Sequence, residues 1–167
     1  MAINKHSMSK KEEHLYPDIE KWLSSYLKDK YKGYTITTTH KTSRQFLDVF
    51  LNQLGINISD AIGLSIKVDI VGVLQRGKSI KLVLIEVKDK QLTLKDLGQL
   101  WGYSQLIDPV ESFLISSVGL GSLDYLLKVR NREDLLRYGK KKEKMMKVCQ
   151  WDSKRKSIDY KTLLPKM

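Results

Sequence analysis

The sequence has only one cysteine, Cys149, among its 167 residues. A single thiol cannot form an internal disulfide, and it cannot supply the cysteines that a zinc or iron–sulfur site takes from one chain. Long apolar runs are missing too, since none approaches the roughly 20 residues of a membrane span. The first residues are charged and lack the hydrophobic core of a signal peptide. We therefore expect a cytoplasmic protein with no membrane partner.

Acidic residues are few relative to basic ones, 19 against 30, which gives a net charge of +11. The excess is unevenly placed. Residues 1–127 hold 16 Lys and Arg against 14 Asp and Glu, whereas residues 128–167 hold 14 against 5. A basic segment on a nearly neutral body is typical of binding to a polyanion, because neutralised phosphates release condensed counterions. We expect DNA to be that partner, and a solvated lysine-rich surface is the alternative for the same charge.

The candidate DNA-binding residues are basic side chains, most of them in the C-terminal segment. They are Lys90, Arg130, Arg132, Lys140, Lys141, Lys142, Lys154 and Arg155.

Val, Ile, Leu and Phe together number 50, which is enough for one hydrophobic core. The chain length suits a single domain over residues 1–167. Within it we expect residues 1–13 to be flexible and residues 128–167 to form the basic C-terminal segment.

Hydrophobic periodicity predicts alternating helices and strands. Helices are expected over residues 17–30, 43–54, 93–107 and 123–138, and strands over 34–39, 66–75, 80–90 and 112–118. Residues 147–160 are either a closing strand pair or a tail. This order predicts an α/β domain with a central mixed sheet flanked by helices.

The two middle strands allow a prediction of register. Gly77-Lys78 suits a two-residue type II′ turn, in which glycine supplies the positive φ. Residues whose numbers sum to 155 then face each other, which places Asp69 opposite Glu86, with Cβ atoms about 5 Å apart. Opposed carboxylates repel each other, and a divalent cation with oxygen ligands would offset that repulsion. Lys88 lies two residues beyond Glu86 and so shares its side of the strand.

Charges at a strand end also occur without any function, because strands emerge into water there. The predicted opposition of two acids is what favours a site, since a stable sheet would otherwise avoid it.

Val68-Asp69, followed after the hairpin by Glu86-Val87-Lys88, resembles the bipartite motif of the PD-(D/E)xK nuclease superfamily, with valine where proline is often seen. Gln99 and Tyr103, at i and i+4 on the next expected helix, resemble the Q-x-x-x-Y signature of the RecB-like and lambda-exonuclease-like members. The resemblance covers residues 15–118. It departs from the minimal core in the expected helix over residues 43–54, which would be a specificity or dimerisation insert.

The resemblance implies a restriction-endonuclease-like core and a Mg²⁺-dependent deoxyribonuclease, with Mn²⁺ as a substitute. Asp69 and Glu86 would hold the metal together with the Val87 carbonyl. In this superfamily a helix before the first strand commonly adds a glutamate, and Glu20 is the residue in that position.

The other implied catalytic residues are Lys88, which would orient or deprotonate a water, and Gln99 and Tyr103, which would position the strand backbone. An endonuclease of repair, recombination, restriction or viral DNA processing fits these features. We also expect a homodimer, because cutting a duplex requires two sites.

Two alternatives stay open at this point. The first is a non-catalytic DNA-binding module that keeps a nuclease-like fold and uses only its basic face. The second is an RNA-cleaving enzyme, because nothing in the sequence reports on recognition of the 2′-hydroxyl.

Overall fold

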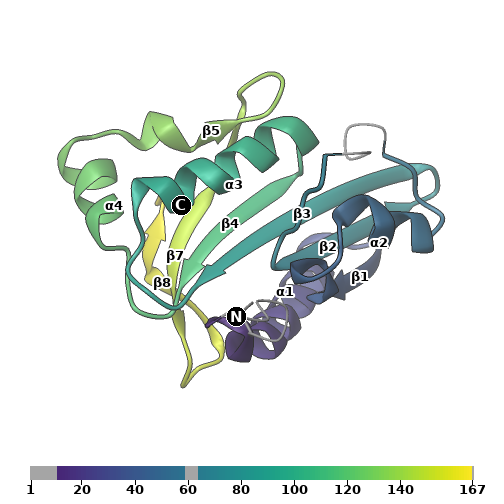
Figure 1. Cartoon of the computed structure of the whole chain (residues 1–167), viewed down its shortest axis with the longest axis horizontal. Coiled ribbons are helices and arrows are strands. Elements are labelled where there is room, and N and C mark those ends of the chain that lie inside the picture. Colours follow the sequence, from purple (N-terminus) through teal and green to yellow (C-terminus); the bar gives the residue numbers. More distant parts are fainter. Residues whose placement is uncertain (1–10, 59–63, 167) are drawn as a thin grey trace, which may run out of the picture.

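A six-stranded mixed sheet forms the centre of the computed structural model, which describes residues 11–58 and 64–166. The strands lie in the order β1-β2-β3-β4-β7-β8 (Figure 1). Their bounds are Thr35–Thr39 for β1, Ile70–Arg76 for β2, Ser79–Lys88 for β3, Glu111–Ser116 for β4, Lys147–Asp152 for β7 and Ser157–Leu164 for β8. β1, β2 and β3 are antiparallel neighbours, β3, β4 and β7 run parallel, and β8 returns antiparallel to β7. The predicted α/β class with a mixed central sheet is confirmed.

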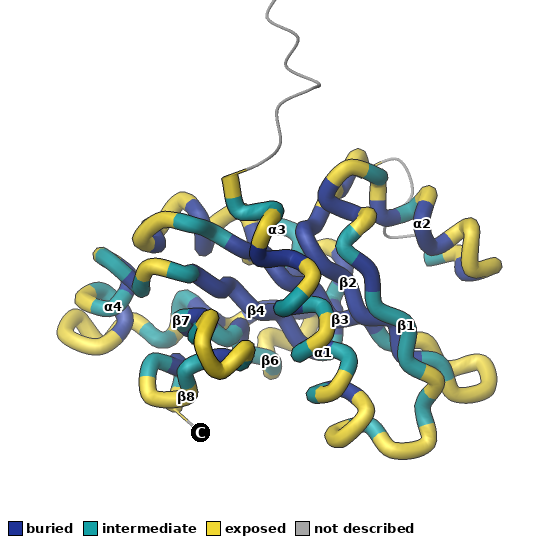
Figure 2. Tube along the Cα trace, turned by 90° about the horizontal axis from the view of Figure 1, so that it is seen from below, coloured by how far each residue is buried: buried dark blue, intermediate teal, exposed yellow. Residues whose placement is uncertain are grey.

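Helices cover both faces of this sheet. α1 (Tyr16–Lys30) packs on one face, where Ile19, Leu23 and Leu27 join a buried cluster with Val83 and Ile85. α3 (Leu94–Ile107) and α2 (Leu47–Gln53) pack on the other face, whose cluster includes alternate β3 residues such as Leu82 and Leu84. Figure 2 shows the buried residues gathered along the central strands, with exposed residues at the turns.

Short elements complete the fold. They are η1 (Glu13–Leu15), η2 (Lys41–Ser43), α4 (Ser122–Asp124), the π-helical η4 (Tyr125–Val129), η5 (Glu133–Leu136) and the strand pair of β5 (Arg137–Tyr138) with β6 (Lys144–Met145).

A glycine in β2 lies under the side chain of Leu27 from α1. A Cβ added at Gly72 would lie 2.7 Å from Leu27 Cδ1, so a larger residue would require the end of the Leu27 side chain to move.

The predicted hairpin register is confirmed. Ile70 pairs with Ile85 and Leu74 with Lys81, as the two-residue turn requires. Gly77 has a φ of +58°, the left-handed conformation that favours glycine at this turn. Residues 147–160 form a closing strand pair, the first of the two readings, and the second strand continues to Leu164.

Two of the expected helices differ in the structure. Residues 43–54 contain only the short α2, preceded by η2. The helix expected over residues 123–138 is wrong. It breaks up after Val129, Asn131 adopts a positive φ of 52°, and Tyr138 joins β5, where its hydroxyl donates to Pro109 O at 3.0 Å. Tertiary contacts of Tyr138 thus override the local helical pattern.

The flexible start expected over residues 1–13 lies mostly outside the described residues. Of this stretch, residues 11 and 12 form a turn and Glu13 begins η1.

A buried carboxylate ties α1 to the amino ends of β4 and β7. Glu111 accepts hydrogen bonds from the hydroxyls of Tyr26 and Tyr31, both at 2.6 Å, and from the Lys147 ammonium. Lys30 Nζ lies 3.1 Å from the same carboxylate. Burial alone would raise the pKa of Glu111, yet Lys147 and the hydroxyls hold the pKa below its ordinary value.

We expect Glu111→Gln to lower the free energy of unfolding at pH 7 by about 3 kcal/mol, because it leaves the mostly buried ammonium of Lys147 without its carboxylate. A depressed folded-state pKa contributes stability above the ordinary carboxyl pKa of about 4.3 and loses it as the pH falls through the folded value. The deficit should therefore shrink on acidification below that range. Urea unfolding of both proteins as a function of pH measures it, with Glu143→Gln, at an exposed site, as control. A deficit that does not change with pH contradicts this role of the Glu111 charge.

Candidate metal and nucleic-acid site

Two acids come together where β2 begins and β3 ends. The ladder between β2 and β3 ends with Ile70 opposite Ile85. Asp69 and Glu86 are the next residues beyond this pair on the two strands. Both are buried, with exposed fractions of 0% for Asp69 and 3% for Glu86. Carboxylates are rarely buried to this extent, so their position is informative.

The Asp69 carboxylate is held from two sides. Its Oδ1 accepts a hydrogen bond from Tyr16 Oη at 2.7 Å, and its Oδ2 accepts one from the Val87 amide at 2.8 Å. The Asp69 carboxylate therefore accepts the hydrogen bond of the Val87 amide at a point where the β2–β3 ladder has ended and no β2 carbonyl is paired with it. Burial, followed by the charges of Asp69 and then of Glu12 and Glu86, raises the pKa of the Tyr16 hydroxyl above its ordinary value. This hydroxyl thus lies within the field of both strand-end acids.

The arrangement of Asp69 differs in detail from the predicted cross-strand pair. Val68 packs in the α3-side cluster together with Val71, although strict alternation would place it with Ile70 on the α1 side. The alternation therefore breaks at the entry to β2. Asp69 follows this bend toward the edge of β3, whereas Glu86 keeps the alternation of Leu84 before it. The two acids thus follow the end of the β2–β3 ladder, with Asp69 bound to Tyr16 of α1 and Glu86 on the side of β3 that Leu84 occupies, and the predicted face-to-face pair is not formed in regular register.

The Val87 backbone adds a third oxygen at this edge. The N–H and C=O of one strand residue point to the same neighbouring strand, and the Val87 N–H meets Asp69, so its carbonyl is directed to the same side. The next residue faces the other way, because Lys88 O accepts from the Ser117 amide on the β4 side at 3.0 Å. Two carboxylates and a carbonyl are the hard oxygen donors that Mg²⁺ prefers.

Lys88 is two residues beyond Glu86 on β3. It is half-buried and shares the side of β3 that Glu86 occupies. Within residues 11–58 and 64–166 its ammonium makes no ion pair or hydrogen bond. Lys90 contrasts with it, since its Nζ lies 2.8 Å from the carboxylate of Asp96 in the capping box of α3. The Lys88 ammonium thus has no partner among these residues, whereas the Lys90 ammonium is bound to the first turn of α3.

Glu20 is not brought to the two acids. Its Oε1 lies 2.7 Å from His40 Nδ1, and its Oε2 accepts from Thr38 Oγ1 at 3.4 Å. In the part of the chain that the structure describes, no three His, Cys, Asp or Glu side chains could together hold a metal ion. The structure shows Glu20 in contact with the end of β1, and its predicted role as a metal ligand stays a prediction. Tyr16, one helical turn earlier on α1, is the residue that reaches Asp69.

Gln99 and Tyr103 lie on α3. Gln99 is exposed, and Tyr103 is half-buried against the α3-side core. Neither side chain forms a hydrogen bond within the described residues. The structure places the pair on the helix that begins beyond β3, without bringing it into contact with the acids, so its role in positioning a strand stays a prediction.

Two of the predicted DNA-binding residues lie at the same end of the sheet as the acids. Lys154 and Arg155 are in the turn between β7 and β8, and β7 runs parallel to β4 and β3, so the carboxyl ends of all three strands point the same way. The neighbouring Lys156 lies 3.9 Å from Asp18 in the first turn of α1. Figure 1 shows this turn beside the start of α1.

Lys90 follows the carboxyl end of β3, and the remaining basic residues are elsewhere. Lys140, Lys141 and Lys142 follow β5, which is tied to the amino end of β4 through Tyr138 and Pro109. They therefore lie at the opposite end of the sheet from Glu86 (Figure 1).

The two arginines that precede β5 are both exposed. Arg130 follows η4, and the Arg132 guanidinium makes a bidentate pair with Asp134. The basic segment predicted as one surface is thus divided between separate regions.

No protein-family model matches the chain, and no curated protein is significantly similar to it. Among the described residues, none of the helices has both the length and the apolar character needed to cross a membrane. A function for this chain therefore rests on its own residues.

A cation that binds only the folded site should stabilise the protein by mass action. We expect Mg²⁺ at about 100 times its dissociation constant to add about 2.7 kcal/mol to the free energy of unfolding. Asp69→Asn should abolish most of this gain, because it removes an anionic ligand. Thermal unfolding with and without Mg²⁺ measures the effect, with Glu143→Gln as control. An equal gain in the Asp69 variant would place the cation somewhere else.

Proposed function

We propose that the protein is a metal-dependent nuclease of the PD-(D/E)xK superfamily that hydrolyses phosphodiester bonds in DNA. The observation that carries the proposal is that buried Asp69 and Glu86 directly follow the last pair of the β2–β3 ladder, while half-buried Lys88 makes no ion pair or hydrogen bond within the described residues. The same residues form the motif that resembles this superfamily. The antiparallel strands β1 to β3, the parallel β4 and the helices on both faces support a restriction-endonuclease-like fold.

The residues present fit Mg²⁺, with Mn²⁺ as a substitute. Asp69, Glu86 and the Val87 carbonyl would hold the ion, and the two carboxylates would balance its charge. When bound, the ion lowers the pKa of a water and neutralises charge that develops on the phosphate.

The chain's own groups have separable tasks. Lys88 holds the attacking water or takes part in its deprotonation, and its charge attracts the phosphate. Tyr16 keeps Asp69 in one orientation, because its hydroxyl and the Val87 amide each bind a different carboxylate oxygen. Gln99 and Tyr103 on α3 would position the strand backbone. Asp69 and Glu86 then form a preorganised anionic centre, and Lys88 supplies the positive charge beside it.

The substrate and assembly follow from charge and geometry. Lys154 and Arg155 would grip phosphates that flank the site, without reading sequence. Cleavage of both strands of a duplex would use two copies of the chain. A repair, recombination, restriction or viral DNA-processing endonuclease fits this arrangement.

Lys88→Ala should lower the rate of DNA cleavage by about 10³-fold, within the range for loss of a group that transfers or orients a proton. Lys81→Ala is the matched control, because Lys81 is also half-buried on β3 but lies at the opposite end of the strand. Cleavage of a labelled duplex under single-turnover conditions measures both rates. Similar rates in the two variants contradict a catalytic role for Lys88. DNA binding without cleavage in the wild type would favour the non-catalytic module.

Replacing both Lys154 and Arg155 with alanine should weaken binding to a short duplex. It should also reduce the slope of log binding constant against log salt concentration by about 2, because each neutralised phosphate contributes about 0.9 to that slope. Fluorescence anisotropy across a salt series, with Ca²⁺ in place of Mg²⁺ to prevent cleavage, measures this change. The double variant of Lys141 and Lys142, at the opposite end of the sheet, serves as control. Equal loss in both variants contradicts the assignment of the β7–β8 turn as the contact nearest the site.

A further inference from the structure

A cleft of about 420 Å³ lies between the start of α1 and the segment that follows β1. Its lining residues are Glu13, Tyr16, His40, Lys41, Ser43, Arg44 and Gln45. The volume is within the range of small-ligand sites, about 300–1,000 Å³. Tyr16 belongs both to this cleft and to the candidate site, because its hydroxyl lies 2.7 Å from the Asp69 carboxylate. A molecule in the cleft would thus lie one side chain away from the strand-end acids.

The rim of the cleft carries a guanidinium whose present partner resembles a phosphate. Arg44 Nε donates to Glu13 Oε1 at 3.1 Å, and its Nη2 donates to Glu13 Oε2 at 2.9 Å. The fork geometry of arginine matches carboxylate and phosphate equally. The Arg44 side chain is 63% exposed, and a pair so open to water contributes little stability, so an incoming phosphate could displace the carboxylate.

The interior of the cleft offers partners for the rest of a nucleotide. The rings of Tyr16 and His40 lie with centroids 6.1 Å apart and inclined by 48°, and His40 is fixed by its contact with Glu20. Ser43 and Gln45 add polar groups that can meet a base or sugar edge. Tyr16 is only 1% exposed, so the ring on which an unstacked base could lie is that of His40, whose side chain is 44% exposed.

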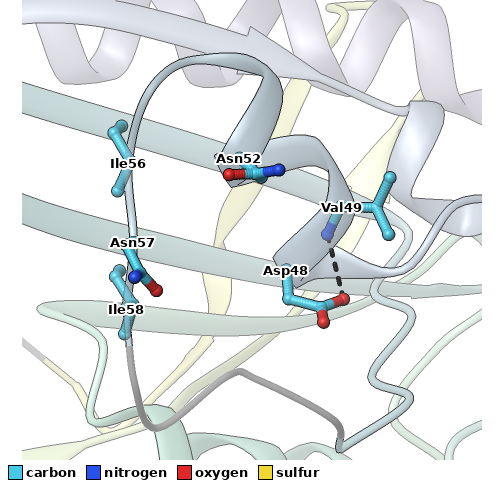
Figure 3. A pocket seen from close by; sticks show the side chains of 6 residues that line it. All are labelled: Asp48, Val49, Asn52, Ile56, Asn57 and Ile58. Carbon is cyan, nitrogen blue, oxygen red and sulfur yellow. Dashed lines mark hydrogen bonds between the residues drawn. The ribbon is translucent and has the colours of Figure 1, made fainter.

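A second hollow, beside α2, has the opposite chemistry. Figure 3 shows Asp48, Asn52 and Asn57 on its walls, with Asp48 Oδ1 accepting from the Val49 amide at 2.9 Å. Its volume of about 320 Å³ is comparable, but its six lining residues, all of them described, include no basic side chain. A side chain that can pair with a phosphate is therefore present in the Arg44 cleft and absent from the lining of this second hollow.

We propose that the Arg44 cleft binds a nucleotide of the DNA strand that is cut. The phosphate of this nucleotide replaces Glu13 as the partner of the Arg44 guanidinium. The inference rests on the proposed nuclease function, and it assigns to the η2–α2 segment the task of holding the substrate beside the scissile phosphate. Glu13 then competes with substrate for Arg44.

Calorimetric titration without metal tests this cleft, using inorganic phosphate, thymidine 5′-monophosphate and a thymidine dinucleotide as probes. Arg44→Ala should weaken nucleotide binding by about tenfold or more, the loss of one charge-assisted bidentate contact. Glu13→Gln should strengthen it severalfold, because the competing carboxylate is gone. Opposite changes in two variants cannot come from misfolding of both. Arg137→Ala, which removes an exposed guanidinium on β5, away from the cleft, should leave binding unchanged.

Weaker binding in Glu13→Gln, or equal losses in the Arg44 and Arg137 variants, overturns the proposal. Inorganic phosphate that binds as tightly as the nucleotides overturns the nucleotide assignment. Cleavage of duplex DNA by the wild type is measured in parallel. If cleavage is absent while the opposite changes in binding persist, the nuclease function fails and the cleft stands. If cleavage is present while the variants bind alike, only the cleft assignment fails.

Discussion

The candidate site depends on the way in which a buried Asp69 carboxylate is fixed. One oxygen binds the hydroxyl of Tyr16 from α1 and the other binds the amide of Val87 from β3, so the helix and the strand meet at a single side chain. These bonds fix the direction of the Val87 carbonyl and hold Asp69 beside Glu86. A buried charge with several hydrogen bonds is tolerated, whereas one without them would be very costly. The fold thus secures an arrangement that electrostatic repulsion between two acids would otherwise oppose.

Tyrosine hydroxyls at the two ends of α1 bind buried carboxylates, but the charges around those carboxylates differ. At its C-terminal end, Tyr26 and Tyr31 bind Glu111, and two lysines neutralise the charge, which is typical of a structural tie. At its N-terminal end, Tyr16 binds Asp69 near a second acid and beside a lysine whose ammonium has no partner in the described chain. The same helix therefore stabilises one end of the sheet and holds a residue of the candidate site at the other.

Much of this arrangement could be predicted from local sequence. A two-residue turn at Gly77-Lys78 determines the register of β2 and β3, because side-chain alternation and turn length leave little freedom. The position of Asp69 on the Val87 amide could not be predicted, since residues before β2 leave the regular alternation. Tyr16 was missed because a tyrosine at the start of a helix carries no motif, although it lies one turn before Glu20. The division of the basic segment follows from parallel strand order, which charge patterning does not encode.

The central claim is that the acids at the ends of β2 and β3 serve a metal ion in DNA hydrolysis. Incubation of the purified protein with matched DNA and RNA duplexes, in Mg²⁺ and in EDTA, tests that claim most directly. A metal-dependent nuclease should cleave the DNA in Mg²⁺ and leave it intact in EDTA. Cleavage that persists in EDTA, cleavage of RNA alone, or no cleavage with either Mg²⁺ or Mn²⁺ would contradict it.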